Sequence, residues 1–193
     1  MLPVHQRKEG ILNKKSVTIV GIIVLVLAVI WLFYLKNTSY EKPEQAIRAA
    51  EKNLTLIPAH QTDNQALYFF VKDDHKYGVT YAQKGMWGWK TRGIIWTKIH
   101  DDRNTSEKLT GYQEYEGQLM YGLLKNTKNR AIYFNKQQAT FLNLDELPKE
   151  VVKKYRLEGM AIWYLEHDAV IEKGVLRLVD TKTNKTIHRI VIK

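Results

Sequence analysis

The stretch that decides the fold is Ser16 to Leu35, which reads SVTIVGIIVLVLAVIWLFYL. These twenty residues carry no charge, and fourteen of them are Val, Ile, Leu or Phe. At about 1.5 Å per residue, a helix of this length covers roughly the 30 Å of hydrocarbon in a bilayer. Placing those fourteen side chains in lipid favours insertion by about 4 to 8 kcal/mol. The segment therefore predicts a transmembrane helix.

A cleaved secretory signal is the alternative interpretation of this segment. Such a signal has a shorter apolar region of about 7 to 15 residues, followed by a cleavage site of small residues. Here the apolar run ends in WLFYLK, and no Ala-x-Ala pattern follows. Nothing on the segment is polar enough to define the solvent face of a core helix. We therefore expect an uncleaved signal anchor at residues 16–35.

Charges on either side of the segment favour one orientation. Four basic residues precede it: Arg7, Lys8, Lys14 and Lys15. The fifteen residues after it hold three basic and two acidic side chains. Because basic flanks tend to stay inside the cell, we expect a cytoplasmic tail at residues 1–15. Residues 36–193, after the anchor, are then extracytoplasmic, in a single-pass protein of the cell membrane.

Residues 36–193 are numerous enough to form a core of their own. The chain has no cysteine, which excludes disulfides, thiolate zinc sites and a thiol nucleophile. Of the net charge of +10, residues 1–35 contribute +3, so about +7 lies in this part. A basic surface favours anionic neighbours such as lipid headgroups, wall polymers or nucleic acid. A surplus of lysine also simply keeps a protein soluble.

The pattern after the anchor predicts an α+β domain of mainly antiparallel sheet. Residues 36–42 are polar and indicate a stalk, and Pro43 opens a short helix that ends near Asn53. From residue 66 onward, runs of β-branched and aromatic residues alternate with turn formers, as in hairpins. The expected strands cover 66–71, 77–81, 94–99, 118–125, 130–134, 139–144, 160–165, 175–179 and 187–192.

Three further expectations complete this outline. A hairpin turn is expected at Lys84-Gly85 and a charged loop at residues 100–108. Asp145 is expected to cap a second helix, which Gly159 ends. The sequence leaves open whether residues 43–193 form one domain or two subdomains, 43–108 and 109–193.

Three stretches of the chain resemble a group of known proteins. They are Val71–Lys90, VKDDHKYGVTYAQKGMWGWK, in which Gly-Trp-Lys closes a hairpin, then Tyr121–Leu144 and the final RLVDTKTNKTI. These stretches are similar to uncharacterised membrane-anchored or secreted proteins of Gram-positive spore-forming bacteria. The resemblance implies export. It contributes no catalytic residue, because that group has no established activity.

Histidines beside acidic residues are the first candidates for metal binding or general-base catalysis. They occur at Asp73-Asp74-His75, His100-Asp101-Asp102 and His167-Asp168. All three places are expected turns, where Asp is common for backbone reasons. No helical i, i+4 pair and no His-x-His on a strand holds two ligands together. We therefore expect no metal site and no cofactor.

Other catalytic arrangements find little support in the sequence. The serines are Ser16, Ser39 and Ser106, and none lies in a Gly-x-Ser-x-Gly elbow. Sugar hydrolysis needs two carboxylates across a cleft, and the candidates are Glu114 with Glu116 or Glu166 with Asp168. Alternation along a strand explains both pairs equally well. We therefore expect no enzymatic activity.

The best candidate contact surface surrounds two tryptophans. It consists of Trp87, Trp89, Lys90 and Arg92, in the sequence MWGWKTR. A glycine-spaced tryptophan pair beside basic residues offers both stacking surface and positive charge. For at least one of the two tryptophans, however, burial in the core is the interpretation that we favour.

These observations favour a non-enzymatic module that binds or senses something at the cell envelope. The membrane bilayer is the expected partner, with an anionic envelope polymer or another membrane protein as further partners. Aromatic and basic residues also occur together in proteins that bind single-stranded nucleic acid, but an extracytoplasmic location argues against nucleic acid. The alternatives are an envelope enzyme acting on wall or lipid substrates and an accessory subunit of a membrane complex. A pocket with converging carboxylates or histidines would indicate the enzyme.

Overall fold

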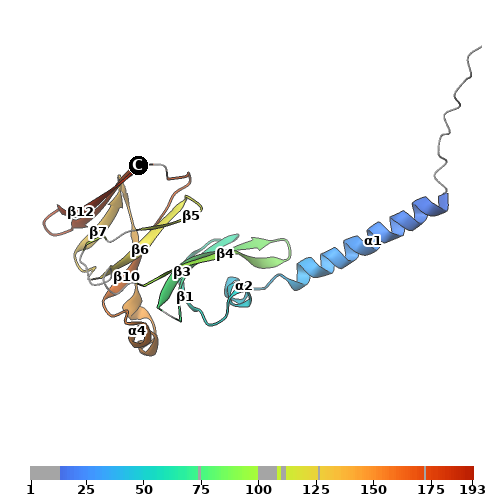
Figure 1. Cartoon of the computed structure of the whole chain (residues 1–193), viewed down its shortest axis with the longest axis horizontal. Coiled ribbons are helices and arrows are strands. Elements are labelled where there is room, and N and C mark those ends of the chain that lie inside the picture. Colours follow the sequence, from blue (N-terminus) through green and yellow to red (C-terminus); the bar gives the residue numbers. More distant parts are fainter. Residues whose placement is uncertain (1–13, 74, 100–107, 110–111, 126, 172) are drawn as a thin grey trace, which may run out of the picture.

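Within the residues that the structure describes, one long helix precedes three antiparallel sheets (Figure 1). The computed structural model describes residues 14–73, 75–99, 108–109, 112–125, 127–171 and 173–193. The long helix is α1 (Lys14–Asn37). The predicted α+β class, with an apolar N-terminal helix and mainly antiparallel strands, is confirmed. The predicted tail at residues 1–15 and loop at 100–108 lie almost wholly outside the described residues.

Each sheet has four strands, and every pair of neighbours is antiparallel. Sheet A contains, in spatial order, β1 (Thr55–Gln61), β2 (Gln65–Lys72), β3 (Lys76–Gly85) and β4 (Gly88–Lys98). Sheet B contains β5 (Gln113–Tyr115), β6 (Leu119–Lys125), β10 (Met160–Glu166) and β9 (Thr140–Asn143). Sheet C contains β12 (Lys185–Ile192), β11 (Gly174–Asp180), β7 (Arg130–Phe134) and β8 (Gln137–Gln138). The short helices are α2 (Pro43–Ala50), α4 (Lys149–Tyr155) and the 3-10 helix η1 (Leu144–Glu146).

The sheets are stacked with sheet B in the middle, and α2 lies on the side nearest α1 (Figure 1). On the outer face of sheet A, Ile47 of α2 packs with Phe70 and Trp89. The other face of sheet A packs on sheet B, whose far face packs on sheet C. Because both of its faces are covered, sheet B contains a continuous buried run from Met160 to Leu165 in β10.

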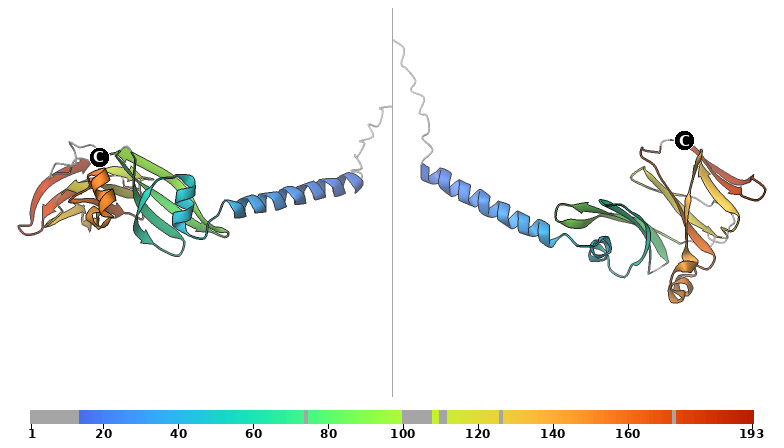
Figure 2. Two further views of the ribbon diagram at one scale, coloured as in Figure 1. Left: turned by 90° about the horizontal axis from the view of Figure 1, so that it is seen from below. Right: turned by 180° about the vertical axis from the view of Figure 1, so that it is seen from behind.

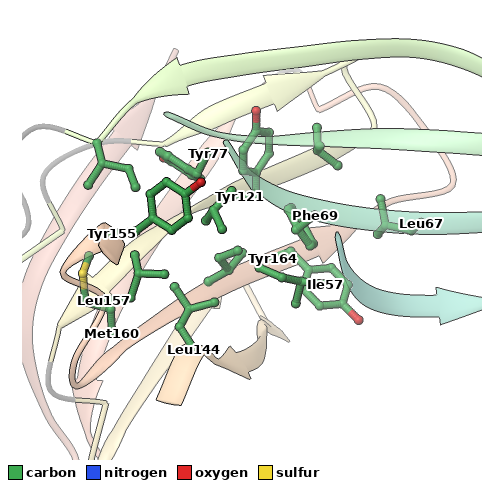
Figure 3. Packing of buried hydrophobic residues seen from close by; sticks show 14 of the residues in the cluster. Ile57, Leu67, Phe69, Tyr77, Tyr121, Leu144, Tyr155, Leu157, Met160 and Tyr164 are labelled. Atoms are coloured by element: carbon green, nitrogen blue, oxygen red, sulfur yellow. The ribbon is translucent and has the colours of Figure 1, made fainter. Parts of the chain in front are cut away.

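The largest hydrophobic cluster joins the two halves of the domain (Figure 3). Phe69 of β2 and Tyr77 of β3 meet Tyr121 of β6, with ring centroids 5.5 and 6.1 Å apart. Tilted and edge-on aromatic pairs of this kind are favourable beyond the area they bury. Tyr155 of α4 belongs to the same cluster. The boundary at residue 108, which the sequence left open, is therefore bridged by a shared core.

The apolar side chains of α1 are not covered by the domain. No part of the stretch Val17–Asn37 is buried, and Leu25 and Phe33 are 65% and 64% exposed. The helix is long and apolar enough to cross a membrane. A continuous row of exposed apolar side chains of this length is unusual on a surface that faces water.

The end of α1 is fixed to the hairpin of β3 and β4, and both views in Figure 2 place the two side by side. The hydroxyls of Thr38 and Ser39 donate hydrogen bonds to carbonyl oxygens in the last turn of α1, at 3.0 and 2.8 Å. Tyr40 and Trp89 then exchange two backbone hydrogen bonds, at 3.0 and 2.7 Å. The segment expected as a stalk, residues 36–42, is therefore bound to the domain rather than extended between it and the helix.

Two local predictions about sheet A differ from the structure. The pattern does not predict β1, because Pro58 interrupts it and β-branched residues are few. Proline is tolerated here since β1 is an edge strand, with an irregular register between Pro58 and His60. The expected turn at Lys84-Gly85 is displaced to Met86-Trp87, because Gly85 still pairs with its partner on β4.

The second predicted helix starts later than expected. Asp145 lies in η1 and does not cap α4; its carboxylate instead accepts a hydrogen bond from the Gly159 N–H at 2.9 Å. Pro148 occupies the position before the first turn of α4. A proline is compatible with this position, because the first backbone N–H groups of a helix have no partner within it.

Candidate functional site

The four residues of the predicted contact surface do not form one surface. Trp89 is only 4% exposed and packs with Ala46 and Ile47 of α2. Its assignment to a contact surface is therefore wrong, and core packing, the interpretation favoured for at least one of the two tryptophans, is confirmed for it. Trp87 is 44% exposed at the turn of the hairpin.

The two basic residues of this group lie in different surroundings. Lys90 is half-buried and lines a shallow hollow beside Thr38 and Tyr40, where α1 ends. Arg92 lines a cavity between sheets A and B, with its Nη2 3.6 Å from Glu116 Oε2. The sequence pattern alone does not reveal this separation, because it depends on a bulge in β4.

That cavity has a volume of about 410 Å³ and is polar. Its lining residues are His60, Gln65, Tyr81 and Arg92 from the sheet A side, and Tyr115, Glu116, Gln118, Glu166, His167 and Asp168 from the sheet B side. Arg92 is the extra residue of the β4 bulge, since Tyr81 pairs with Gly93 and Ala82 pairs with Thr91. A β-bulge commonly changes the direction in which a side chain points next to a functional site.

Glu166, in the wall of this cavity, connects the two sheets. Its Oε1 accepts a hydrogen bond from the Tyr81 hydroxyl at 2.7 Å, and its Oε2 lies 3.0 Å from His60 Nδ1. The second contact becomes an ion pair when His60 is protonated. Burial, together with the hydrogen bond to Glu166, raises the pKa of Tyr81 far above its usual value, so this hydroxyl remains a donor.

A second hollow, of about 350 Å³, adjoins the first at His60 and Glu166. It adds Gln137, Gln138, Thr140, Tyr164 and Leu165 to the lining. Gln137 also donates a side-chain hydrogen bond to the backbone carbonyl of Glu166 at 2.9 Å. The His60–Glu166 contact is therefore accessible from both hollows. The side chain of His60 is 40% exposed and that of Glu166 is 33% exposed.

The charges in the cavity favour some ligands over others. Glu116, Glu166 and Asp168 supply three carboxylates, against one guanidinium from Arg92. Such a site accepts hydrogen bonds from hydroxyl or ammonium groups better than it binds an anion. Of the candidate carboxylate pairs, Glu166 and Asp168 line this cavity together, whereas Glu114 is not in the lining and Glu116 lies there without it.

The histidine–acid pair at Asp73 and His75 lies outside the cavity and contacts α4. His75 meets the ring of Tyr155 edge-on at 6.4 Å, and Asp73 accepts hydrogen bonds from Lys154 and Tyr155 at 2.8 and 3.0 Å. Asp74 and residues 100–102 lie outside the described part of the chain. In the part that is described, no three His, Asp or Glu side chains converge closely enough to hold a metal ion.

Sequence reasoning finds only part of this cavity. His60 is missed because β1 is not predicted. Tyr81 is predicted only as a core residue, because it lies in a strand with alternating apolar and polar residues. His167 and Asp168 are found as a histidine–acid pair, without any indication of their partners. Comparisons of the chain with known protein families, with curated proteins and with solved structures find no match.

Proposed function

We propose that the protein is a single-pass membrane protein that holds a non-enzymatic binding or sensing module at the outer face of the cell membrane. The polar cavity around Glu166 is the observation that carries this proposal. It lies between two sheets that share a core, so its walls are held in place by packing. Pre-formed concave sites with a few converging polar groups are the usual location of ligand binding.

Support for the anchor comes from the length of α1 and its flanks. A 24-residue helix is about 36 Å long, which exceeds the roughly 30 Å of hydrocarbon in a bilayer. Trp31 and Tyr34 are 62% and 64% exposed near the end that leads to the domain. Aromatic residues concentrate at membrane interfaces, and basic residues favour the cytoplasmic side. The four basic residues before the uncharged run, of which Lys14 and Lys15 begin α1, thus support an N-terminus inside the cell.

The ligand that fits the cavity is hydroxyl-rich or cationic, such as a sugar or amino sugar of the cell envelope. Carboxylates, glutamines and histidines can together accept and donate hydrogen bonds to several hydroxyl groups. The outer surface has the opposite preference. With about +7 of net charge on residues 36–193, it favours an anionic polymer or lipid as its surroundings.

A titration of the full-length protein in detergent micelles tests the binding site. The probes are glucosamine and N-acetylglucosamine oligosaccharides, and amide chemical shifts are the readout. We expect shift changes around Gln118 and Asp168, and several-fold weaker binding in Gln118→Ala and Asp168→Asn. Thr186→Ala, in a separate hollow on sheet C, is the matched control and should bind normally. Shift changes elsewhere, or binding that both cavity variants retain, would refute the assignment.

An envelope hydrolase is the second candidate, because the convergence of Glu116, Glu166 and His60 in one cavity is the feature expected of an enzyme. It ranks second because both carboxylate oxygens of Glu166 are already engaged, one by the Tyr81 hydroxyl and one by His60. Sugar hydrolysis uses one carboxylic acid as proton donor and a second carboxylate as base or nucleophile. The two candidates differ in what happens to the probe. A binding module returns the oligosaccharide intact, whereas a hydrolase shortens it and loses this activity in Glu166→Gln. Mass analysis of the oligosaccharide after incubation decides between them.

A further inference from the structure

The turn of the β3–β4 hairpin is apolar where most turns are polar. Gly85 pairs with Gly88, so Met86 and Trp87 form a two-residue turn, called the hairpin tip below. Two-residue turns usually hold Asn, Asp or Gly, which suit both the backbone and contact with water. Met86 is 91% exposed and Trp87 is 44% exposed. Two large apolar side chains thus occupy the most outlying position of the hairpin.

The hairpin tip is held close to the end of α1. Tyr40, which pairs with Trp89, follows the last residue of the helix, Asn37, by three residues. Three residues span at most about 11 Å. Gly88 permits the contact, because a Cβ there would lie only 2.5 Å from the Tyr40 carbonyl oxygen. Figure 1 and both views of Figure 2 agree in placing the tip beside this end of the helix.

We infer that the hairpin tip inserts into the headgroup region of the same bilayer that α1 crosses. This inference rests on the proposed membrane anchoring. The polar region adds about 5 to 8 Å on each side of the hydrocarbon, which is within reach of the tip. Tryptophan favours this region because its ring is apolar and its N–H is a donor. The flexible thioether of Met86 adapts to the same surroundings.

Basic residues around the tip match the charge of a lipid surface. Lys84 is exposed, with its Nζ 5.9 Å from the Trp89 ring, and Lys36 lies in the last turn of α1. Long basic side chains can bury their stems while their charged ends reach lipid phosphates. A bilayer therefore fits both the apolar tip and its basic surroundings. A dissolved anionic polymer would engage the lysines and leave Met86 in water.

Insertion would give the domain a fixed orientation. One attachment point, α1, allows the domain to rotate about the helix end, whereas two attachment points restrict it. Tyr81, in the wall of the polar cavity, precedes Gly85 by four residues, about 14 Å along a strand. The cavity is then held near the membrane surface, where it would meet ligands attached to or lying on that surface.

The absence of cysteine from the chain allows a spin label to be placed at single sites of the full-length protein. Three variants are reconstituted into bilayers of phosphatidylcholine and phosphatidylglycerol: Met86→Cys at the tip, Leu27→Cys in α1, and Thr183→Cys in the turn between β11 and β12. Collision with oxygen, which concentrates in lipid, is compared with collision with a water-soluble nickel chelate. We expect the nickel accessibility at position 86 to be several-fold below that at position 183, and higher than that at position 27.

The same comparison separates the two proposals. A label at position 86 that is as accessible to nickel as the one at position 183 overturns the inference while position 27 remains in lipid. A label at position 27 that is accessible to nickel overturns the membrane anchoring and the inference with it. As a second test, Gly88→Ala should release the tip, so that the nickel accessibility at position 86 rises to that at position 183.

Discussion

At Gly88 the backbone adopts φ +127°, where a side chain would also collide with the Tyr40 carbonyl. Both effects act against Gly88→Ala, and together we expect them to lower the free energy of unfolding by about 2 kcal/mol or more. Gly85→Ala is the matched control, because a Cβ there would approach nothing closer than 3.9 Å. Urea unfolding of the full-length protein in detergent measures the free energy of unfolding of both variants. Equal losses in the two variants would contradict the role assigned to Gly88.

Two buried tyrosines differ in whether their hydroxyl groups have a partner. Tyr81 donates to Glu166 at 2.7 Å, whereas the Tyr121 hydroxyl has no hydrogen-bond partner among the described residues. We expect Tyr81→Phe to lower the free energy of unfolding by about 1 to 2 kcal/mol, because Glu166 loses a donor. Tyr121→Phe removes an unsatisfied group and should leave stability equal or higher. A larger loss in Tyr121→Phe than in Tyr81→Phe, measured by urea unfolding, would contradict this difference.

Among the elements, the turn between β2 and β3 is tied to α4 by Asp73. Hydrogen bonds from Lys154 and then Tyr155 hold the pKa of Asp73 below its usual value of 3.8. A carboxylate with a lowered pKa stabilises the fold above the unfolded-state pKa, and this contribution disappears as pH falls through the folded-state pKa. The contribution should therefore be complete at neutral pH and absent in strong acid.

The Tm of Asp73→Asn, compared with the natural protein from pH 7 to pH 2, checks this pH dependence. We expect the variant to melt at a lower temperature at neutral pH, with the difference closing below about pH 4, near the unfolded pKa of Asp. Asp63→Asn, at an exposed position before β2, serves as the control. A difference that persists unchanged in strong acid would show that Asp73 acts through packing instead.

Elements with a strong local pattern are predictable from the sequence, whereas the cavity is not. The uncharged run of α1 and the buried run of β10 are found directly, and Tyr77, Val79 and Tyr81 share a face in the core as their alternation predicts. The site depends instead on long-range pairing. Tyr81 and Glu166 are 85 residues apart, and nothing local relates them. The bulge that brings Arg92 to the cavity is likewise a property of the register between two strands.

At the scale of the whole molecule, the shared core has a consequence for unfolding. Because one hydrophobic cluster contains residues of sheet A and sheet B, neither half can lose its structure without exposing apolar surface of the other. We expect a single cooperative transition, seen at the same urea concentration by far-ultraviolet circular dichroism and by tryptophan fluorescence. Two separate transitions would indicate that residues 43–108 and 109–193 fold as independent units.

The proposed placement of the domain outside the cell depends on α1 crossing the membrane once. Labelling of two single-cysteine variants in intact cells with a membrane-impermeant maleimide tests this most directly. We expect Thr183→Cys, at the far end of the domain, to react before lysis, and Gln6→Cys, ahead of α1, to react only after it, with both proteins in the membrane fraction. The reverse pattern of labelling, or recovery of either protein from the soluble fraction without detergent, would contradict the proposed anchoring and orientation.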